Sequence, residues 1–346
     1  MTLQQLFGIA LPIVQAPMAG VQGSALTVAV SNAGGLGSLP CAMLGAEALR
    51  KELAAIRAQI DKPYNVNFFC HVPPQPSAAH DAAWRDALAP YFAELGLEAE
   101  VPAGPARVPF DAAAADLLAQ FRPPVVSFHF GLPAPELLAR ACGWGAKVLS
   151  SATTVEEALW LEERGVDAII AQGLEAGGHR GMFLSEDLAG QVGTFALVRQ
   201  VAQAVKTPVI AAGGIADAEG VAAALALGAA GVQVGTAYLL CPEATTTALH
   251  RQALKSQAAR VTAVTNVFTG RPARGIVNRV IRELGPISPA APAFPLAAAR
   301  MGALRAAAES RGSSDFSPLW AGQNASGCRE VPAAVLTREL ARGVGR

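Results

Sequence analysis

The amino-acid sequence predicts an α/β protein, a (β/α)8 TIM barrel joined to a second, smaller and mainly helical lobe. Short apolar runs without polar alternation recur along the chain, which is typical of parallel strands covered on both faces. Gly- or Pro-marked turns follow these runs, and Ala/Leu-rich stretches long enough to cross back over a strand come next. The length of 346 residues exceeds the ~250 residues of a typical single barrel, which leaves room for the lobe.

Eight apolar runs are predicted to be the barrel strands, with helical patterns between them. The expected strands are residues 13–15, 35–38, 64–68, 125–128, 147–150, 168–171, 208–211 and 231–234. The expected helices include residues 45–60, 155–164, 193–205 and 218–227. Open doubly wound sheets share this alternation, but eight βα units in succession favour closure into a barrel.

Two segments interrupt the alternation. Residues 72–123 begin with Pro73, Pro74 and Pro76 and continue as an Ala-rich helical stretch. Residues 242–346 follow the eighth strand and contain Pro and Gly clusters. Because both segments leave the barrel at strand ends, we expect them to form a lobe over its mouth. Residues 1–71 and 124–241 would then form the barrel itself.

Charge and cysteine content argue against several classes of function. Lys+Arg and Asp+Glu both number 27, so no basic surplus indicates a nucleic-acid partner. The five cysteines form no CxxC pair, which argues against a zinc ribbon or a disulfide framework and favours reduced thiols in the cytoplasm. No metal site is expected.

Neither a secretory signal nor a membrane span is expected. No Lys or Arg precedes Arg50, so the basic region that opens a signal peptide is lacking. The stretch between Glu219 and Glu243 carries no charged residue. Its glycines and Gln233 divide it into a helix and a short strand, which predicts a buried helix–strand unit.

Polar residues and glycines gather directly after several expected strands, where the active site of a barrel lies. These positions are Gln15, Asn67, His71, His129, Gln172, Gly213, Gly214, Gly235 and Thr236. The glycines follow the seventh and eighth strands, where barrels often bind a ligand phosphate, because bare backbone allows N–H groups to approach the anion. Asp217 fits the N-cap of the next helix. The alternative is that these glycines form tight turns without a ligand.

The amides and histidines near these strand ends are compatible with a flavin site. Asn67 and Gln172 match the mixed donor and acceptor edge of a flavin ring, although such amides also cap exposed strand ends. His179 lies in a Gly-rich loop, and an imidazole there accepts a proton from a carbon acid or stabilises an anion. Two other histidines fit a functional or a structural role equally: His71 and His129. The last two are expected to be solvated: His80 and His250.

Further segments carry a specific resemblance. The most discriminating are residues 65–71 (NVNFFCH) and 269–275 (TGRPARG). Others are residues 15–18 (QAPM), 127–131 (SFHFG), 171–181 (AQGLEAGGHRG), 211–215 (AAGGI), 233–237 (QVGTA) and 320–323 (WAGQ). Together they resemble class I nitronate monooxygenases, formerly called 2-nitropropane dioxygenases, over nearly the whole chain. The EAGGHxG loop is also shared with flavin-dependent enoyl-ACP reductases.

The resemblance implies an FMN-binding barrel under a substrate lobe, with His179 as the catalytic residue. The implied FMN contacts are Gln15, Ala16, Pro17, Met18, Asn67, Gln172, Gly177, Gly178, Gly213, Gly214, Gln233, Gly235 and Thr236. The implied substrate contacts are His71, His129, Phe294 and Arg300. The implied reaction is oxidation of an alkyl nitronate, such as propionate 3-nitronate, by O2 to a carbonyl compound and nitrite or nitrate, a detoxification. His179 would act either protonated, stabilising the anion, or neutral, deprotonating a nitroalkane.

One stretch departs from the family pattern. A Tyr-Pro-x-x-x-Tyr-like segment followed by a Lys is expected to line the substrate pocket, but the chain reads FPLAAARMG at residues 294–302. The hydroxyls are replaced by apolar groups at Phe294 and Ala298, and loss of a hydrogen-bonding site alters selectivity. Arg300 is a candidate replacement for the lost cation.

Two alternative functions stay open on the sequence. One is an NAD(P)H-dependent flavin reductase of quinones or enoyl thioesters that uses the same barrel and loop. The other is a flavin- or phosphate-binding barrel without catalytic activity, for which the change at Phe294 is the support. A monomer and a homodimer are both compatible with the sequence.

Overall fold

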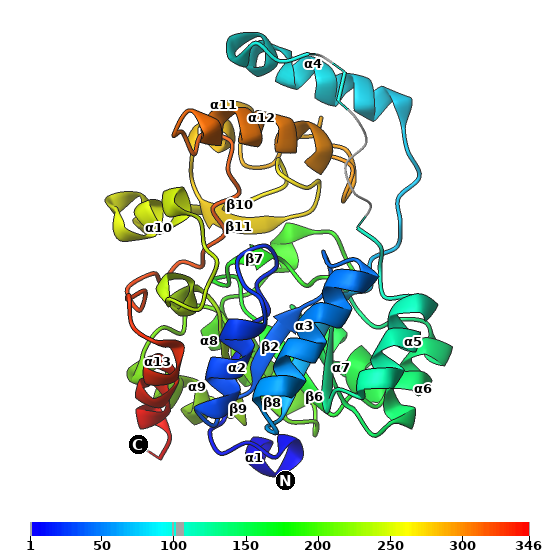
Figure 1. Cartoon of the computed structure of the whole chain (residues 1–346), viewed down its shortest axis with the longest axis vertical. Helices are drawn as coiled ribbons and strands as arrows, with labels where there is room; N and C mark the ends of the chain where they lie inside the picture. Colours follow the sequence, from blue (N-terminus) through cyan, green and yellow to red (C-terminus); the bar gives the residue numbers. More distant parts are fainter. Residues whose placement is uncertain (1, 99, 102–106, 346) are drawn as a thin grey trace.

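A computed structural model gives the structure of the chain and describes residues 2–98, 100–101 and 107–345. Residues 99 and 102–106, within the range expected for the lobe, lie outside the described residues, as do the end residues 1 and 346. Figure 1 shows a barrel of strands and helices with a second layer of helices standing over one end of it. Both chain termini lie at the opposite end of the barrel.

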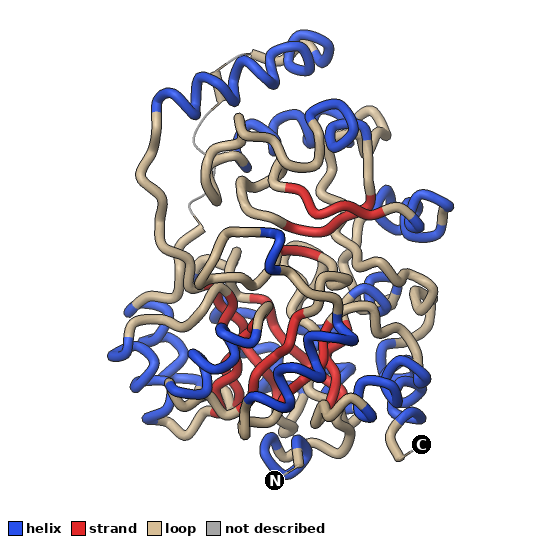
Figure 2. The backbone as a smooth tube through the Cα atoms, turned by 180° about the vertical axis from the view of Figure 1, so that it is seen from behind, coloured by secondary structure: helices blue, strands red, loops and turns tan. Residues whose placement is uncertain are grey.

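Eight parallel strands of the described chain form the central sheet, with strand order β1-β9-β8-β6-β5-β4-β3-β2. They are β1 (Ile13–Gln15), β2 (Gly37–Pro40), β3 (Tyr64–Phe69), β4 (Val125–His129), β5 (Lys147–Ala152), β6 (Ala168–Gln172), β8 (Val209–Ala212) and β9 (Gly231–Val234). Figure 2 shows these strands enclosed by helices. Nearly every residue of these strands is buried, as continuous apolar strands require.

The sheet closes on itself between its first and last strands. Val14 forms a parallel bridge with Leu36, the residue just before β2. The Gln15 amide donates to the Leu36 carbonyl at 2.9 Å, and the Leu36 amide donates to the Ile13 carbonyl at 2.8 Å. The predicted TIM barrel is therefore confirmed. The second strand begins two residues later than expected, because Leu36 contributes only the closing bridge.

Helices cover the outside of the barrel. They are α2 (Ser24–Asn32), α3 (Ala46–Gln59), α6 (Pro135–Gly143), α7 (Val155–Glu163), α8 (Thr194–Ala204) and α9 (Ala218–Ala226). Asp217 caps α9 as predicted, since its Oδ1 accepts the Gly220 amide at 2.8 Å. The short helix α1 (Leu3–Phe7) lies at the end of the barrel away from the lobe and packs Leu3 and Phe7 into a cluster with Val14 and Ile210.

The second layer has a hydrophobic core of its own. Its helices are α4 (Ala78–Leu95), α10 (Ala248–Lys255), α11 (Arg279–Leu284) and α12 (Ala298–Ser310). Trp84 and Leu88 of α4 pack with Leu304 of α12 in this core, and Figure 1 shows α4 lying over α11 and α12. The layer also contains the antiparallel strands β10 (Thr262–Thr265) and β11 (Ala273–Ile276). A two-residue strand, β7 (Gly178–His179), pairs with β11 and joins this layer to the barrel.

Two helices within the ranges expected for the lobe pack on the barrel instead. They are α5 (Ala112–Phe121), which contacts α3 and α6, and α13 (Ala333–Leu340), which contacts α2 and α9. The packing thus favours a lobe that ends before α5 and before α13. Across the described residues, no helix combines the length and the apolar character needed to cross a membrane.

Candidate active site

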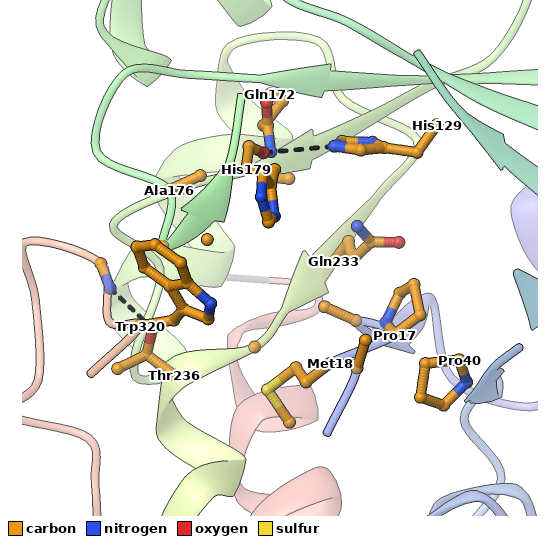
Figure 3. A pocket seen from close by; sticks show the side chains of 18 of the residues that line it. Pro17, Met18, Pro40, His129, Gln172, Ala176, His179, Gln233, Thr236 and Trp320 are labelled. Carbon is orange, nitrogen blue, oxygen red and sulfur yellow. Dashed lines mark hydrogen bonds between the residues drawn. The ribbon is translucent and has the colours of Figure 1, made fainter. Parts of the chain in front are cut away.

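A cavity of about 200 Å³ opens at the carboxyl ends of the barrel strands, on the side of the lobe. Most residues that the sequence suggested for the site line it (Figure 3): Ala16, Pro17, Met18, Asn67, His129, Gln172, Gly177, Gly178, His179, Gly213, Gly214, Gln233, Gly235 and Thr236. The barrel thus gathers residues that lie more than 200 positions apart in the sequence around one hollow.

Gln15 is not among the residues that line the cavity. Its side chain is fully buried. Its Oε1 accepts the Ser38 amide at 3.0 Å, and its Nε2 donates to Gln22 Oε1 at 2.7 Å. Gln22 Oε1 also accepts the Met18 amide at 3.1 Å. Gln15 therefore ties β1 to β2 and shapes the segment 16–18 from behind.

The suggested substrate contacts other than His129 lie outside the cavity lining. Phe294 is buried and meets the His179 ring edge-on, with centroids 5.4 Å apart. His71 also meets Phe294 edge-on, with centroids 4.8 Å apart. Arg300 lies on α12, where its guanidinium is 3.8 Å from the Asp81 carboxylate. Phe294 and His71 therefore form a second row behind His179, and Arg300 points to α4.

His179 is held through both its backbone and its ring. In β7 it pairs with Ala273 of β11. Its carbonyl oxygen accepts Gln172 Nε2 at 3.0 Å and His129 Nε2 at 3.2 Å, and Figure 3 shows the bond from His129. Its ring Nε2 lies 2.9 Å from Thr269 Oγ1 in the lobe. Barrel and lobe thus fix the imidazole at the cavity wall together.

The environment of His179 keeps its imidazole neutral. Burial lowers the pKa of His179 well below its ordinary value, and the positive charges of Arg107 and Arg271 lower the pKa further. Of the two protonation states that the sequence allowed, the structure thus favours the neutral one, which can accept a proton.

His129 holds His179 in position through a hydrogen bond. Its Nε2 must carry a proton in order to donate to the His179 carbonyl, so its Nδ1 accepts from the Ser151 hydroxyl at 3.0 Å. Burial lowers the pKa of His129 to about 4, which keeps the ring neutral in this arrangement. Both ring nitrogens are therefore engaged within the protein.

The side-chain amides near the strand ends differ in which of their atoms form hydrogen bonds within the protein. Gln172 uses its Nε2 for the His179 carbonyl and its Oε1 for the Gly181 amide, at 2.7 Å, so it mainly shapes the Gly-rich loop. Asn67 donates from Nδ2 to the Ser127 carbonyl and hydroxyl. Gln233 Oε1 is buried without a hydrogen-bond partner in the described chain. A buried acceptor without a donor indicates that a ligand is to supply one.

The glycine-rich ends of β8 and β9 form a cradle of bare backbone. Gly213 and Gly214 have φ angles of +120° and +72°, a region that favours glycine. A Cβ atom on Gly213 would lie 2.6 Å from Thr194 Oγ1, so the chain there has no room for a side chain. The amides of Gly214, Gly235 and Thr236 have no acceptor among the described residues. Free amides at such turns suit an anionic phosphate.

Arg107 is a cavity residue that sequence reasoning missed. Its guanidinium carbon lies 5.4 Å from the centre of the Phe294 ring, and burial lowers its pKa. No Asp or Glu is among the described residues that line the cavity, and no described carboxylate forms an ion pair with Arg107. Arg107 is half-buried, and a partly desolvated cation without a counter-ion attracts an anionic ligand. Arg107 lies in a Pro- and Ala-rich segment without any motif, so the sequence offered no signal for it.

His250 was expected to be solvated, and that prediction is wrong. It is only 4% exposed and lines the cavity from α10. Its Nε2 has no partner in the described chain, and burial lowers its pKa to about 4. The polar pattern of α10 suggested a surface helix, but the inner face of α10 covers the cavity. Two further residues line the cavity: Trp320, which the sequence marked only as part of the WAGQ segment, and Asn324, which it did not mark.

Comparison with known proteins places the chain in a family. The model of a family described as "Nitronate monooxygenase" matches residues 1–343. The chain belongs to this family. A nitronate monooxygenase of Pseudomonas aeruginosa is 47% identical over 339 residues, which are 97% of each chain. The chain is therefore an oxidoreductase of the nitronate monooxygenase type, and this family is flavin-dependent.

Two solved structures are similar to the chain over almost its whole length. A nitroalkane oxidase from Streptomyces ansochromogenes superimposes with a TM-score of 0.89 at 40% identity, over 99% of this chain and 98% of that one. FabK from Thermotoga maritima superimposes with a TM-score of 0.73 at 29% identity, over 99% and 96%. Both likenesses span barrel and lobe together.

Proposed function

We propose that the protein uses FMN to oxidise alkyl nitronates with O2 to a carbonyl compound and nitrite or nitrate. One observation carries the choice of substrate: a neutral His179 lies beside the unpaired Arg107 cation in a cavity with no carboxylate among its described lining residues. A nitronate is an anion, so Arg107 attracts it, and no carboxylate among the described lining residues repels it. A neutral imidazole adds hydrogen bonding without competing for Arg107.

The cavity also offers what FMN requires. The free amides of Gly214, Gly235 and Thr236 would hold the phosphate. The unpartnered Gln233 Oε1 would accept from a ring N–H, and Pro17 and Met18 give an apolar wall for a flat ring system. The chemistry that FMN supplies when bound is electron transfer from the nitronate to O2.

The side chains of this protein would bind and orient the substrate. Arg107 holds the anionic end, and His179 faces the reacting carbon. His129 and Gln172 keep His179 in place through its carbonyl oxygen. Trp320, from the segment beyond the lobe core, closes one side of the cavity and limits water near the reacting carbon.

The proposal also covers the cellular location and the physiological role of the enzyme. All five cysteines are free, which fits a cytoplasmic enzyme that removes toxic nitronates. The substrate partners would be a small nitronate and O2. Sedimentation measurements distinguish a monomer from a homodimer.

An NAD(P)H-dependent flavin reductase of quinones or enoyl thioesters is the alternative. The likeness to FabK over nearly the whole chain is the observation that keeps it in view. Rapid mixing of the purified protein with NADH and with NADPH under anaerobic conditions separates the two functions. Fast loss of flavin absorbance would favour the reductase.

The test of the proposed function uses the protein as purified. We expect a yellow protein whose released cofactor has the mass of FMN. We also expect O2 consumption and nitrite formation with propyl-1-nitronate and with propionate 3-nitronate. A colourless protein that does not bind added FMN, or a yellow one that consumes no O2 with either nitronate, would overturn the proposal.

A further inference from the structure

The His179 ring contacts Thr269, a residue of the lobe that has no role in the proposed function. Thr269 lies between β10 and β11, is 4% exposed, and has its Oγ1 2.9 Å from His179 Nε2. The same Oγ1 lies 3.4 Å from the Arg271 carbonyl oxygen. A single hydroxyl thus connects the imidazole to the backbone of the lobe.

The loop that carries Thr269 is held firmly in place. The Gly270 amide donates to the Asn266 carbonyl at 2.8 Å. A Cβ atom on Gly270 would lie 2.0 Å from the Pro292 carbonyl oxygen, so the loop touches the neighbouring segment directly. The Arg180 amide donates to the Pro272 carbonyl at 2.8 Å, next to His179. The distance between Thr269 and the imidazole is therefore set by the backbone on both sides.

The direction of these hydrogen bonds follows from what each group can do. A carbonyl oxygen only accepts, so the Thr269 hydroxyl proton is directed to Arg271. The hydroxyl oxygen then has a lone pair for a proton on His179 Nε2. A neutral imidazole has one N–H, so Nδ1 carries the lone pair. Nδ1 has no hydrogen-bond partner among the described residues, and the ring lies at the cavity wall (Figure 3).

We propose that Thr269 is a positioning residue that fixes the Nε2–H tautomer of His179 and so makes Nδ1 a base for neutral nitroalkanes. This inference rests on the proposed function, because the nitronate formed would be the substrate of the oxidation. Nδ1 takes the proton from the carbon next to the nitro group. The C–H electron pair moves into the nitro group, which gives the nitronate and an imidazolium.

This step creates two charges, and a different group stabilises each of them. The nitronate is stabilised by Arg107, which has no other counter-ion in the described chain. The imidazolium is stabilised by the nitronate beside it. With Nδ1 protonated instead of Nε2, the lone pair would face Thr269 and the reaction would lack its base.

A nitronate supplied from outside has no such proton to lose. Thr269 should therefore matter for a nitroalkane and hardly at all for the corresponding nitronate. A purely structural role would affect both substrates alike. This split separates the two roles of Thr269.

The experiment compares Thr269→Val, which removes the hydroxyl and keeps the shape, with Thr269→Ser, which keeps the hydroxyl. With 1-nitropropane we expect kcat/KM to fall by about 10²-fold in Thr269→Val, the scale of a lost acid–base contribution. With propyl-1-nitronate we expect a change below about 3-fold, and Thr269→Ser should restore most of the loss with 1-nitropropane. Equal losses on both substrates would overturn the proposal.

A second measurement reads the tautomer itself. In protein with 15N-labelled histidine, the resonances lost in His179→Asn identify His179. We expect a protonated Nε2 and an unprotonated Nδ1 in the wild type, and a mixture of tautomers in Thr269→Val. A protonated Nδ1 in the wild type would overturn the proposal. Because this reading needs no turnover, it tests Thr269 even if the wild type oxidises neither substrate and the proposed function fails.

Discussion

The guanidinium carbon of Arg107 lies 5.4 Å from the centre of the Phe294 ring, and that ring meets His179 edge-on. Arg107 is also the charged group that contributes most to the low pKa of His179. A residue from the first part of the lobe segment thus places a cation next to the imidazole. Phe294, where the family resemblance led us to expect a tyrosine, provides the apolar support for that cation.

Replacement of Arg107 should weaken substrate binding. Hydrogen bonds to charged groups contribute about 1.5–3 kcal/mol, so Arg107→Gln is expected to raise KM for propyl-1-nitronate by roughly 10- to 100-fold. Arg107→Lys keeps the charge without the forked geometry of the guanidinium. Its KM should lie between those of the wild type and Arg107→Gln. Steady-state O2 consumption gives both constants.

The control is Arg85→Gln, because Arg85 is exposed on α4 and, among the described residues, forms an ion pair only with Asp86, at 3.8 Å. Its KM is expected to equal that of the wild type. If Arg107→Gln also leaves KM unchanged, Arg107 has no part in binding the nitronate.

Replacement of His179 should slow turnover and leave the cofactor bound. The ring faces the cavity, whereas the proposed phosphate cradle is built from backbone amides around Gly214 and Gly235. His179→Asn is therefore expected to keep its flavin absorbance and to lose about 10²-fold or more in kcat with 1-nitropropane, the substrate from which His179 would take a proton. Absorbance spectra and O2 consumption on the same preparation check both parts. A rate equal to that of the wild type would remove His179 from the mechanism.

Replacement of Gly214 should have the opposite effect and release FMN. A valine there would place its Cβ 3.4 Å from Glu175 Cβ, so its branches would press on the chain next to the cradle, and it would strain a φ of +72°. Gly165→Val is the matched control, since Gly165 has a φ of +74° and no atom within 4 Å of an added Cβ, on the turn before β6. We expect Gly214→Val to be purified colourless and Gly165→Val to be yellow. Equal flavin content in both variants would place the phosphate elsewhere.

The barrel was predictable from the sequence because its strands follow a simple physical rule. A parallel strand such as β6 is covered on both faces, so it appears as an unbroken apolar run ended by Gln172. The strand β7 has only Gly178 and His179 and pairs with the distant β11, so no local pattern announces it. That pairing is what brings His179 to Thr269.

The candidate site was predictable only where a residue follows a strand. Asn67, Gln172 and Gly214 were found by that rule, and the structure places all three at the cavity. Arg107 comes from a segment outside the barrel pattern, and His250 from a helix that seemed polar. Their positions depend on how the lobe packs over the barrel, which is a long-range contact that no short window of sequence encodes.

The buried histidines should make the protein lose stability in mild acid. Burial lowers the pKa of both His129 and His250 to about 4, whereas an unfolded chain has histidine pKa values near ~6.5. The unfolded state therefore binds protons first as the pH falls, so the free energy of unfolding is highest above pH ~6.5 and declines below it. By pH ~5 the loss is about 2 kcal/mol for each ring, from ~1.4 kcal/mol per pH unit.

Urea unfolding of the holoenzyme at several pH values between ~7 and ~5 measures this slope. His250→Leu removes one of the buried rings. Over the same pH range, the free energy of unfolding of this variant should therefore fall by about 2 kcal/mol less than that of the wild type. His80→Asn is the control, because His80 is exposed on α4 and its loss should leave the slope unchanged. The range ends near pH ~5 because most carboxylates titrate below it. Only a group whose proton affinity differs between the folded and unfolded states makes stability depend on pH. If the slope of unfolding free energy against pH is the same in the wild type and in His250→Leu, His250 is not buried as a neutral ring.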